Sequence, residues 1–250
     1  MSKQGVIIVK VGTGVLTLDD GSLNHQSITS LSNNLAGLIL DGRKVILVSS
    51  GAVGAGVPLF KLKEYPQDIA TRQAAAAIGQ THLLQRYQDA FTPHGITIAQ
   101  ILLSSYDLQE ATHRERAQSV LTRLLDQPNV IPIVNENDVV SLRELTQTDN
   151  DMLAANLSVI TEAEALILLT SVDGLLDENS EVIAQVNDVA AASARFAKES
   201  GGKFSIGGMK SKLDAVQVAS SKGVRVVIGN GERPERLVGY FDQSSIGTYF

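Results

Sequence analysis

The sequence predicts an α/β fold, a three-layer αβα sandwich with a mainly parallel central sheet. Short runs rich in β-branched residues alternate with longer segments of helical periodicity, as in chains built from β-α units. Most of these runs are apolar throughout, which is typical of strands that helices cover on both faces. The predicted strands are residues 6–11, 44–49, 96–103, 130–135, 165–170 and 224–229.

Helical patterns fill the intervals between these strands. Residues 24–40 place five apolar side chains on one stripe, and Asp41-Gly42 ends the pattern. Residues 174–186 predict a hairpin instead, with Asp-Glu-Asn-Ser at its turn. The other predicted helices are residues 71–91, 114–126, 151–163 and 209–223.

Composition restricts the function. We expect residues 1–250 to form a single domain, because no linker or repeat divides the chain. A net charge of −6 and an aromatic content of 4% do not favour nucleic acid as a partner. The absence of cysteine excludes disulfides, thiolate metal sites and thiol nucleophiles. The apolar run near the N-terminus is too short to span a membrane, so we expect a soluble cytoplasmic protein with no membrane partner.

The residues that follow each strand matter most, because parallel sheets bind ligands beyond the carboxyl ends of their strands. Lys10 lies at the end of the first predicted strand, and Gly12 and Gly14 follow it. Glycines let a ligand approach the backbone closely. A lone lysine at a strand end usually extends into solvent, so Lys10 alone is a weak indication of a site.

The segment Ser-Ser-Gly-Ala-Val-Gly-Ala-Gly, residues 49–56, follows the second predicted strand. Successive backbone N–H groups at a strand-to-helix junction suit an anion, although a flexible connecting turn has the same composition. The segment is not a P-loop, since it has no Gly-Lys-Ser/Thr ending, and it is not the dinucleotide motif G-x-G-x-x-G.

Asparagine and aspartate gather in two further segments, Asn-Glu-Asn-Asp at residues 135–138 and Asp-Asn-Asp at residues 149–151. Each could simply cap a helix, which favours the same residue types. Two such clusters indicate more than capping, and together they could hold an ammonium group, a lysine or a hydrated Mg²⁺ ion.

Lys210 and Lys212 fall in the first turn of the last predicted helix, after a glycine pair. Cations there oppose the helix dipole unless an anion offsets them, and phosphate is the natural anion. Exposed loop lysines are the alternative. The four histidines show no metal-ligand spacing, so we expect no protein-held metal site, and no G-x-S-x-G elbow supports a serine hydrolase.

Taken in order, these motifs resemble the amino acid kinase family. The segments that carry the resemblance are SSGAVGAG, RQAAAAIGQ, IPIVNEND, DND, LLTSVDGL and GGMKSK. Within the family, the set is similar to the branch that phosphorylates free glutamate, and the likeness extends from residue 6 to the end of the chain. The resemblance implies the family's αβα fold and a kinase domain without the C-terminal PUA-type domain of many relatives.

The resemblance also implies a reaction, the transfer of the γ-phosphate of ATP to the side-chain carboxylate of L-glutamate. The product is L-glutamyl 5-phosphate, in the first step of proline biosynthesis, and the cofactors are ATP and Mg²⁺. Lys10 and Lys212 would contact the phosphoryl group from opposite sides, and Asp151 would hold both lysines. Such transfer needs positioning and cations more than covalent help from the protein.

Binding residues follow from the same likeness. The residues implied for glutamate are Ser50, Gly51, Ala52, Asp138 and Asn150. The residues implied for ATP are Lys10, Thr170, Ser171, Ile206, Gly207, Gly208, Met209, Lys210, Ser211 and Lys212. Three places depart from the residues usual in the family, which bears on nucleotide and glutamate affinity: Thr148, Ser171 and the pair Ser205-Ile206.

The resemblance further implies a homodimer or homotetramer, proline as a feedback inhibitor, and a glutamyl phosphate reductase as a partner for the labile product. Two other functions remain open at this stage. One is a kinase for another small acid such as N-acetylglutamate. The other is a non-catalytic sensor of an amino acid or nucleotide.

Overall fold

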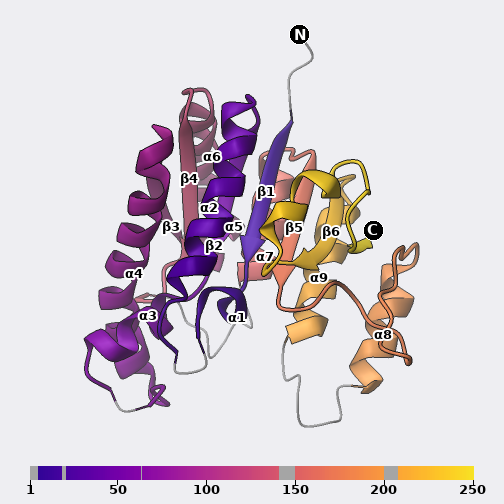
Figure 1. Cartoon of the computed structure of the whole chain (residues 1–250), viewed down its shortest axis with the longest axis horizontal. Coiled ribbons are helices and arrows are strands. Elements are labelled where there is room, and N and C mark those ends of the chain that lie inside the picture. The colour runs from indigo at the N-terminus through magenta and orange to yellow at the C-terminus, as the bar shows by residue number, and fades with distance from the viewer. Residues whose placement is uncertain (1–4, 19–20, 63, 141–149, 200–207) are drawn as a thin grey trace.

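A seven-stranded sheet forms the centre of the protein (Figure 1). The computed structural model describes residues 5–18, 21–62, 64–140, 150–199 and 208–250. In that part of the chain the strand order is β3-β4-β2-β1-β5-β6-β7. The strands are β1 (Val6–Val11), β2 (Lys44–Ser49), β3 (Thr97–Leu103), β4 (Val130–Glu136), β5 (Ala165–Thr170), β6 (Arg225–Asn230) and β7 (Thr248–Tyr249).

All neighbouring strands from β3 to β6 are parallel, and only the pairing of β7 with β6 is antiparallel among the described residues. The predicted fold class and the six predicted strands are confirmed, with their ends within about one residue. The two-residue strand β7 was not predicted, because two residues are too short to show a period.

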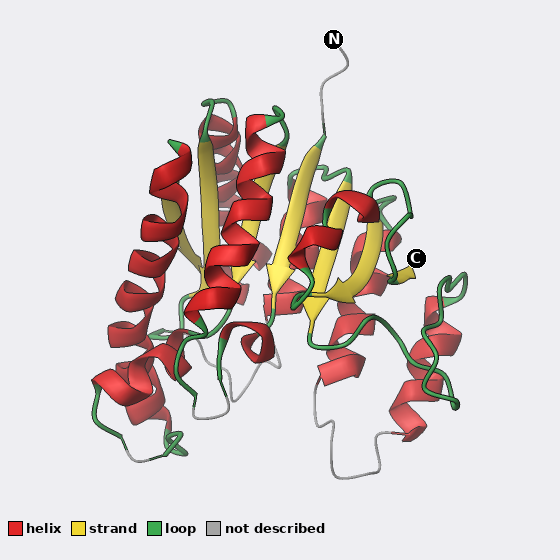
Figure 2. Cartoon of the chain, in the orientation of Figure 1, coloured by secondary structure: helices red, strands yellow, loops and turns green. Residues whose placement is uncertain are grey.

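Helices cover both faces of the sheet (Figure 2). The α-helices of the described residues are α1 (Thr13–Leu16), α2 (His25–Leu40), α3 (Ala52–Leu59), α4 (Ile69–Phe91), α5 (Ser105–Gln109), α6 (Ala111–Leu125), α7 (Asn150–Ile160), α8 (Val189–Glu199) and α9 (Gly208–Ser220). Three 3₁₀ turns accompany them: η1 (Thr92–His94), η2 (Pro234–Arg236) and η3 (Val238–Tyr240). The five predicted helices correspond to α2, α4, α6, α7 and α9.

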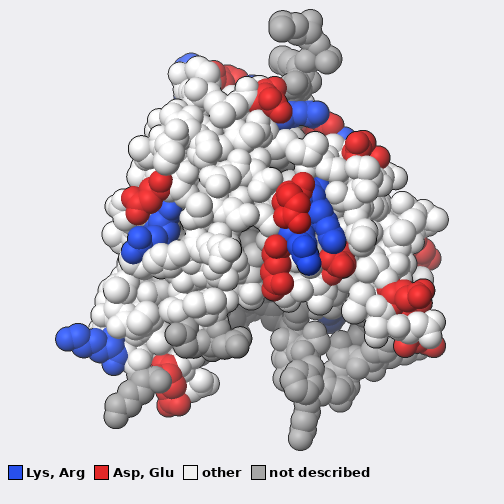
Figure 3. Space-filling view, viewed as in Figure 1, with Lys and Arg blue, Asp and Glu red and all other residues white. Residues whose placement is uncertain are grey.

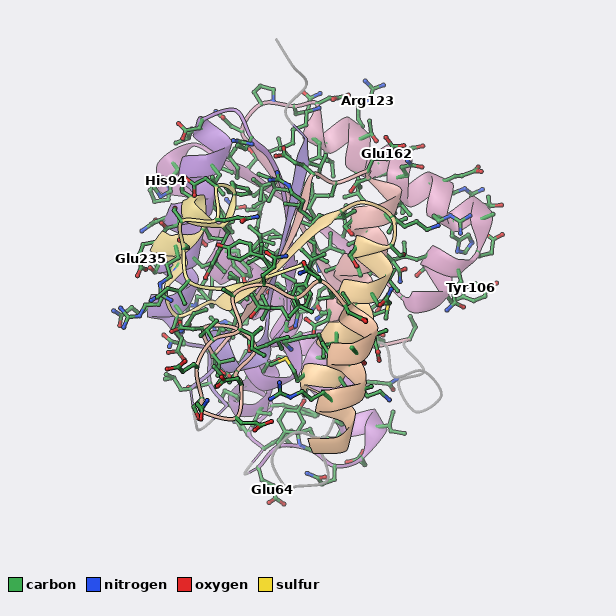
Figure 4. All side chains as sticks on the ribbon, turned by 90° about the vertical axis from the view of Figure 1, so that its right-hand side faces the viewer. Glu64, His94, Tyr106, Arg123, Glu162 and Glu235 are labelled. Atoms are coloured by element: carbon green, nitrogen blue, oxygen red, sulfur yellow. The ribbon has the colours of Figure 1, made fainter. Side chains whose placement is uncertain are left out.

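Two apolar cores separate the layers. One packs α1, α2 and α4 against the sheet, and the other packs α5, α6, α7 and α9 against the opposite face. Figure 4 looks from the side on which α9 lies in front of the sheet, and Tyr106 and Arg123 point away from the protein there. Acidic and basic side chains lie intermingled on the face that Figure 3 shows.

Strand β1 determines where Lys10 points. Side chains alternate between the faces of a strand, so Ile7, Val9 and Val11 join the core beneath α2 while Ile8 joins the core beneath α7. Lys10 follows Ile8 by two residues, so its side chain lies on the same face of the sheet as Ile8, the face that α7 and α9 cover.

The secondary structure of two segments, residues 49–56 and residues 174–186, differs in detail from the predictions. The glycine segment at residues 49–56 is not a loop throughout, because α3 begins at Ala52 after Gly51, which has a left-handed φ of 99°. The predicted hairpin is present as a turn in which Asp177 N–H donates to Glu181 O at 2.8 Å, closed by one antiparallel bridge between Leu176 and Val182.

Helices α3 and α4 approach each other through their backbones. A Cβ atom on Gly79 would lie 1.9 Å from Ala52 O, and one on Gly56 would lie 1.9 Å from Ala75 O. Only glycine allows these helices to approach so closely, and this contact holds α4 against the start of α3. None of the helices described has an apolar stretch long enough to cross a bilayer.

We expect Gly79→Ala to lower the free energy of unfolding by about 2 kcal/mol, because the added methyl group must push α4 away from Ala52 O. Gly37→Ala is the matched control, since a Cβ on Gly37 of α2 meets nothing within 4 Å. That change should instead raise stability by roughly 0.5–1 kcal/mol. Urea unfolding followed by circular dichroism measures both. Equal stabilisation by the two alanines would contradict the close packing of α3 and α4.

Candidate active site

The carboxyl ends of the parallel strands meet at one edge of the sheet, the lower edge in Figure 1. Strand β1 lies in the middle, paired with β2 on one side and β5 on the other. A strand flanked in this way marks the topological switch point, where α/β sheets bind ligands. Two clusters of polar side chains lie at this edge. Asn150, the first residue of α7, belongs to one cluster, and Asp151, the second residue, belongs to the other.

The lysine cluster consists of Lys10, Asp151 and Lys212. Lys10 Nζ lies 2.5 Å from Asp151 Oδ1, and Lys212 Nζ donates to Asp151 Oδ2 at 3.0 Å. Three separate elements, β1, α7 and α9, supply these residues. Lys10 is 5% exposed and Asp151 is 1% exposed, so the charges lie beneath the protein surface. The fold therefore brings together the three residues that were predicted to handle phosphate.

Electrostatics explain why these charges can be buried together. Burial raises the pKa of Asp151, but the attraction of Lys10 and then of Lys212 outweighs it, so the pKa lies below its ordinary value of 3.8. One carboxylate between two ammonium groups leaves one positive charge in excess. Lys212 is the fifth residue of α9, just beyond its first turn, so the positive end of the helix dipole lies close to the cluster and adds to that field. The cluster suits a multiply charged anion such as phosphate.

Glycines keep the space beside the lysine cluster open. A Cβ on Gly12 would make ordinary contacts, 3.7 Å from Lys10 Nζ and 3.5 Å from Leu169 O, so a side chain longer than that of alanine would be needed to fill the space beside the ammonium group. A Cβ on Gly14 would meet nothing within 4 Å. A ligand can therefore come close to Lys10 from the side of the backbone that follows β1.

The amide cluster consists of Ser50, Asn135 and Asn150. Asn150 Nδ2 donates to Ser50 Oγ at 2.9 Å, to Asn135 Oδ1 at 2.9 Å and to Ser49 O at 3.0 Å. All three residues of the cluster are less than 9% exposed. A buried network of this kind holds its side chains in one arrangement, which suits the recognition of a small polar molecule.

The start of α3 borders the amide cluster. Gly51 is the N-cap of α3 and Ala52 its first residue, and no side chain caps this end. The first N–H groups of a helix have no partner within it, and the dipole makes this end positive. Together with the Ser50 hydroxyl, these groups are suited to a carboxylate.

The other residues predicted to bind ligands lie around the same edge. Asp138 is half-buried in the turn after β4, where its N–H donates to Glu136 O at 3.0 Å. Thr170 ends β5 and Ser171 follows it, exposed. Gly208, Met209, Lys210 and Ser211 form the start of α9.

Five of the residues named from the sequence, Thr148, Asp149, Ser205, Ile206 and Gly207, lie outside the described residues.

Sequence reasoning missed three side chains that support the amide cluster. Asn135 was part of a quoted motif but received no role of its own. Gln80 of α4 accepts from Asn135 Nδ2 at 2.8 Å, and Tyr87 OH lies 2.9 Å from Ser49 Oγ. Gln80 is the last residue of the segment RQAAAAIGQ but, like Asn135, received no role of its own, and Tyr87 lies in an ordinary helical pattern. Neither contact could be predicted, because each joins residues far apart in the chain.

A sequence model of the amino acid kinase family matches residues 5–230. The chain is 38% identical to glutamate 5-kinase of Clostridium acetobutylicum, over 100% of this chain and 96% of that protein. It is 39% identical to glutamate 5-kinase of Symbiobacterium thermophilum, over 98% of this chain and 95% of that protein.

Two solved structures share the fold at low sequence identity. Isopentenyl phosphate kinase in a substrate complex has a TM-score of 0.65 at 18% identity, covering 97% of this chain and 99% of that chain. Carbamate kinase from Giardia lamblia bound to AMP-PNP has a TM-score of 0.66 at 13% identity, covering 100% of this chain and 99% of that chain.

We expect Asp151→Asn to lower the free energy of unfolding at pH 7 by about 3 kcal/mol, because two buried ammonium groups lose their carboxylate. The pKa of Asp151 is lower in the folded chain, so its stabilisation is complete above the ordinary value of 3.8 and is lost as pH falls through the folded value. The difference between wild type and variant should therefore shrink below about pH 4.

Urea unfolding at pH 7, 5, 4 and 3 measures this difference. The exposed Asp41 at the end of α2 provides the control, and Asp41→Asn should change stability by less than about 0.5 kcal/mol. An Asp151→Asn protein as stable as wild type at pH 7 would contradict the account of the lysine cluster.

Proposed function

Because the chain belongs to the amino acid kinase family, we infer that it transfers the γ-phosphate of ATP to the side-chain carboxylate of L-glutamate. The product is L-glutamyl 5-phosphate, and the reaction is the first step of proline biosynthesis. Among the structural observations, the lysine cluster beside the amide cluster supports this function most directly. It offers two cations for a phosphoryl group next to neutral donors for an acid.

The nucleophile needs no base. The side-chain carboxylate of glutamate has an ordinary pKa of about 4.3, so it is ionised at neutral pH. A carboxylate oxygen forms a bond to the γ-phosphorus, the bond from that phosphorus to the bridging oxygen breaks, and ADP leaves with the electron pair. No proton has to move in this step, which agrees with a site built from lysines, amides and a hydroxyl.

The two lysines supply the electrostatic part of the reaction. Lys10 and Lys212 would contact the oxygens of the transferring group from two sides, where negative charge is spread in the transition state. Asp151 touches both ammonium groups and would keep them at a fixed separation. Its role is positional, and the cluster retains the net positive charge that the phosphoryl group requires.

Glutamate would bind at the amide cluster and at the start of α3. Ser50, Asn150 and the N–H groups from Gly51 and Ala52 suit its carboxylates, and the Asp138 carboxylate suits its α-ammonium group. Asn150 and Asp151 are consecutive residues of one helix turn, so α7 would hold the acid and the lysine cluster at a constant distance.

ATP would bind beyond β5 and at the start of α9, through Thr170, Ser171 and residues 206–212. Magnesium fits this site as a companion of the nucleotide. Among the described residues no group of three His, Cys, Asp or Glu side chains could hold a metal ion, and both oxygens of Asp151 face lysines. Mg²⁺ commonly keeps several waters and binds through substrate phosphates. It would add positive charge beside the transferring group.

Further features belong to the same proposal. The resemblance supports a homodimer or homotetramer, proline as a feedback inhibitor, and transfer of the labile acyl phosphate to a glutamyl phosphate reductase. A single kinase domain and a cytoplasmic location agree with one continuous sheet and with the absence of cysteine.

The decisive experiment incubates the protein with Mg-ATP and L-glutamate, traps the acyl phosphate with hydroxylamine and measures ADP and hydroxamate. We expect hydroxamate from wild type and a fall of about 100-fold or more in kcat for Lys212→Ala, since a cation on the transferring group is lost. Lys222→Ala, an exposed lysine just beyond α9, is the matched control and should keep wild-type activity.

Other outcomes separate the alternatives. Product from N-acetylglutamate or aspartate, but none from glutamate, would support phosphoryl transfer to a carboxylate and show that the acid substrate is not glutamate. Binding of ligands without turnover of any acid would overturn the kinase and favour a sensor.

A further inference from the structure

Helix α4 reaches two strand ends of the site with two polar side chains. Gln80 and Tyr87 are seven residues apart, which places them on the same face of the helix two turns from each other. Gln80 contacts Asn135 at the end of β4, and Tyr87 contacts Ser49 at the end of β2. The close backbone contact between Gly79 and Ala52 holds this part of α4 next to the site.

The backbone fixes the direction of the hydrogen bonds in the amide cluster. The N–H of Glu136 can only donate, and it donates to Asn135 Oδ1 at 2.9 Å and to Asn150 Oδ1 at 3.2 Å. Each amide therefore turns its oxygen toward Glu136 and its nitrogen away. The Asn135 nitrogen then faces Gln80, and the Asn150 nitrogen faces the backbone carbonyl of Ser49 and the Ser50 hydroxyl.

Gln80 completes this arrangement. Asn135 is 2% exposed, so its amide nitrogen has little access to water and depends on Gln80 Oε1 as acceptor at 2.8 Å. Without that acceptor, a buried N–H group would lose its partner, which is costly enough to favour rotation of the amide. Rotation would turn the Asn135 nitrogen toward Glu136 N–H and toward Asn150 Nδ2, both of them donors.

The direction of these bonds determines what Ser50 can offer to a ligand. Ser50 Oγ accepts from Asn150, so its own hydrogen is left to donate elsewhere. Among the residues that the structure describes, no acceptor for that hydrogen is found. The Ser50 hydroxyl can therefore donate to an acid at the edge of the sheet.

We propose that Gln80 is a positioning residue for the acid substrate, acting through Asn135 and Asn150 to make the Ser50 hydroxyl a hydrogen-bond donor to its carboxylate. This inference rests on the proposed function, since it names a further determinant of the same acid site. The lysine cluster is held through Asp151 instead, so the effect of Gln80 is confined to the acid and does not extend to the nucleotide.

Steady-state kinetics of Gln80→Met test the proposal. Methionine has a similar length and no amide acceptor. We expect the KM for glutamate to rise about tenfold, the loss of roughly one good hydrogen bond, while the KM for ATP changes little and the melting temperature falls by only a few degrees. Gln85→Met is the matched control, because Gln85 is an exposed glutamine on the same helix whose amide contacts only Asp89 among the described residues.

A double-mutant cycle tests whether Gln80 acts through Asn135. Asn135→Ala should raise the KM for glutamate by itself, and adding Gln80→Met to it should have no further effect. Fully additive effects would overturn the proposal. If Asn135→Ala does not fold, Gln80→Glu replaces it: its carboxylate still accepts from Asn135, so its KM for glutamate should lie closer to wild type than that of Gln80→Met.

Two failures are distinguishable. An active wild type whose Gln80→Met variant keeps its KM for glutamate, or raises both KM values equally, overturns the role of Gln80 and leaves the kinase function standing. A wild type that forms no acyl phosphate from glutamate overturns the proposed function, and the role of Gln80 with it.

Discussion

The burial of the Lys10 ammonium group at the end of the central strand is the constraint on which the site depends. An unpaired charge beneath the surface would be strongly unfavourable, and Asp151 offsets it at 2.5 Å. The same carboxylate holds Lys212, so one aspartate joins β1, α7 and α9. The excess positive charge that remains is the property on which phosphoryl chemistry relies. In the proposed function, stability and reactivity would come from the same three side chains.

Helix α7 connects the lysine cluster to the amide cluster. Its second residue binds the lysines, and its first residue, Asn150, binds Ser50, Asn135 and the backbone of Ser49. Neighbouring side chains at a helix start point in different directions, so one turn can serve two ligands. In the proposed function, a rigid helix placed between the clusters would keep an acid and a phosphoryl group in a fixed geometry, which is the main requirement of this chemistry.

Much of this could be predicted from the sequence, because the signals are local or belong to whole motifs. The apolar runs identified the six long strands, and the ordered set of motifs at their ends, with Lys10 at the end of the first strand, indicated a ligand site. The helix α3 was missed because its glycines resemble a loop, and glycine weakens any helical pattern. Gln80, Asn135 and Tyr87 could not be paired with their partners, since each contact joins residues far apart in the chain and depends on how closely α4 packs.

The sheet order also has a consequence for the newly made chain. Strand β1 is synthesised first, yet one of its two neighbours, β5, and the carboxylate that offsets Lys10 come much later. From Lys10 to Asp151 is 151 − 10 = 141 residues, which a ribosome adds in about 7–28 s at 5–20 residues per second. During that time the lysine keeps its water and the middle of the sheet stays open on one side. The centre of the finished protein is thus among the last regions to become buried as it leaves the ribosome.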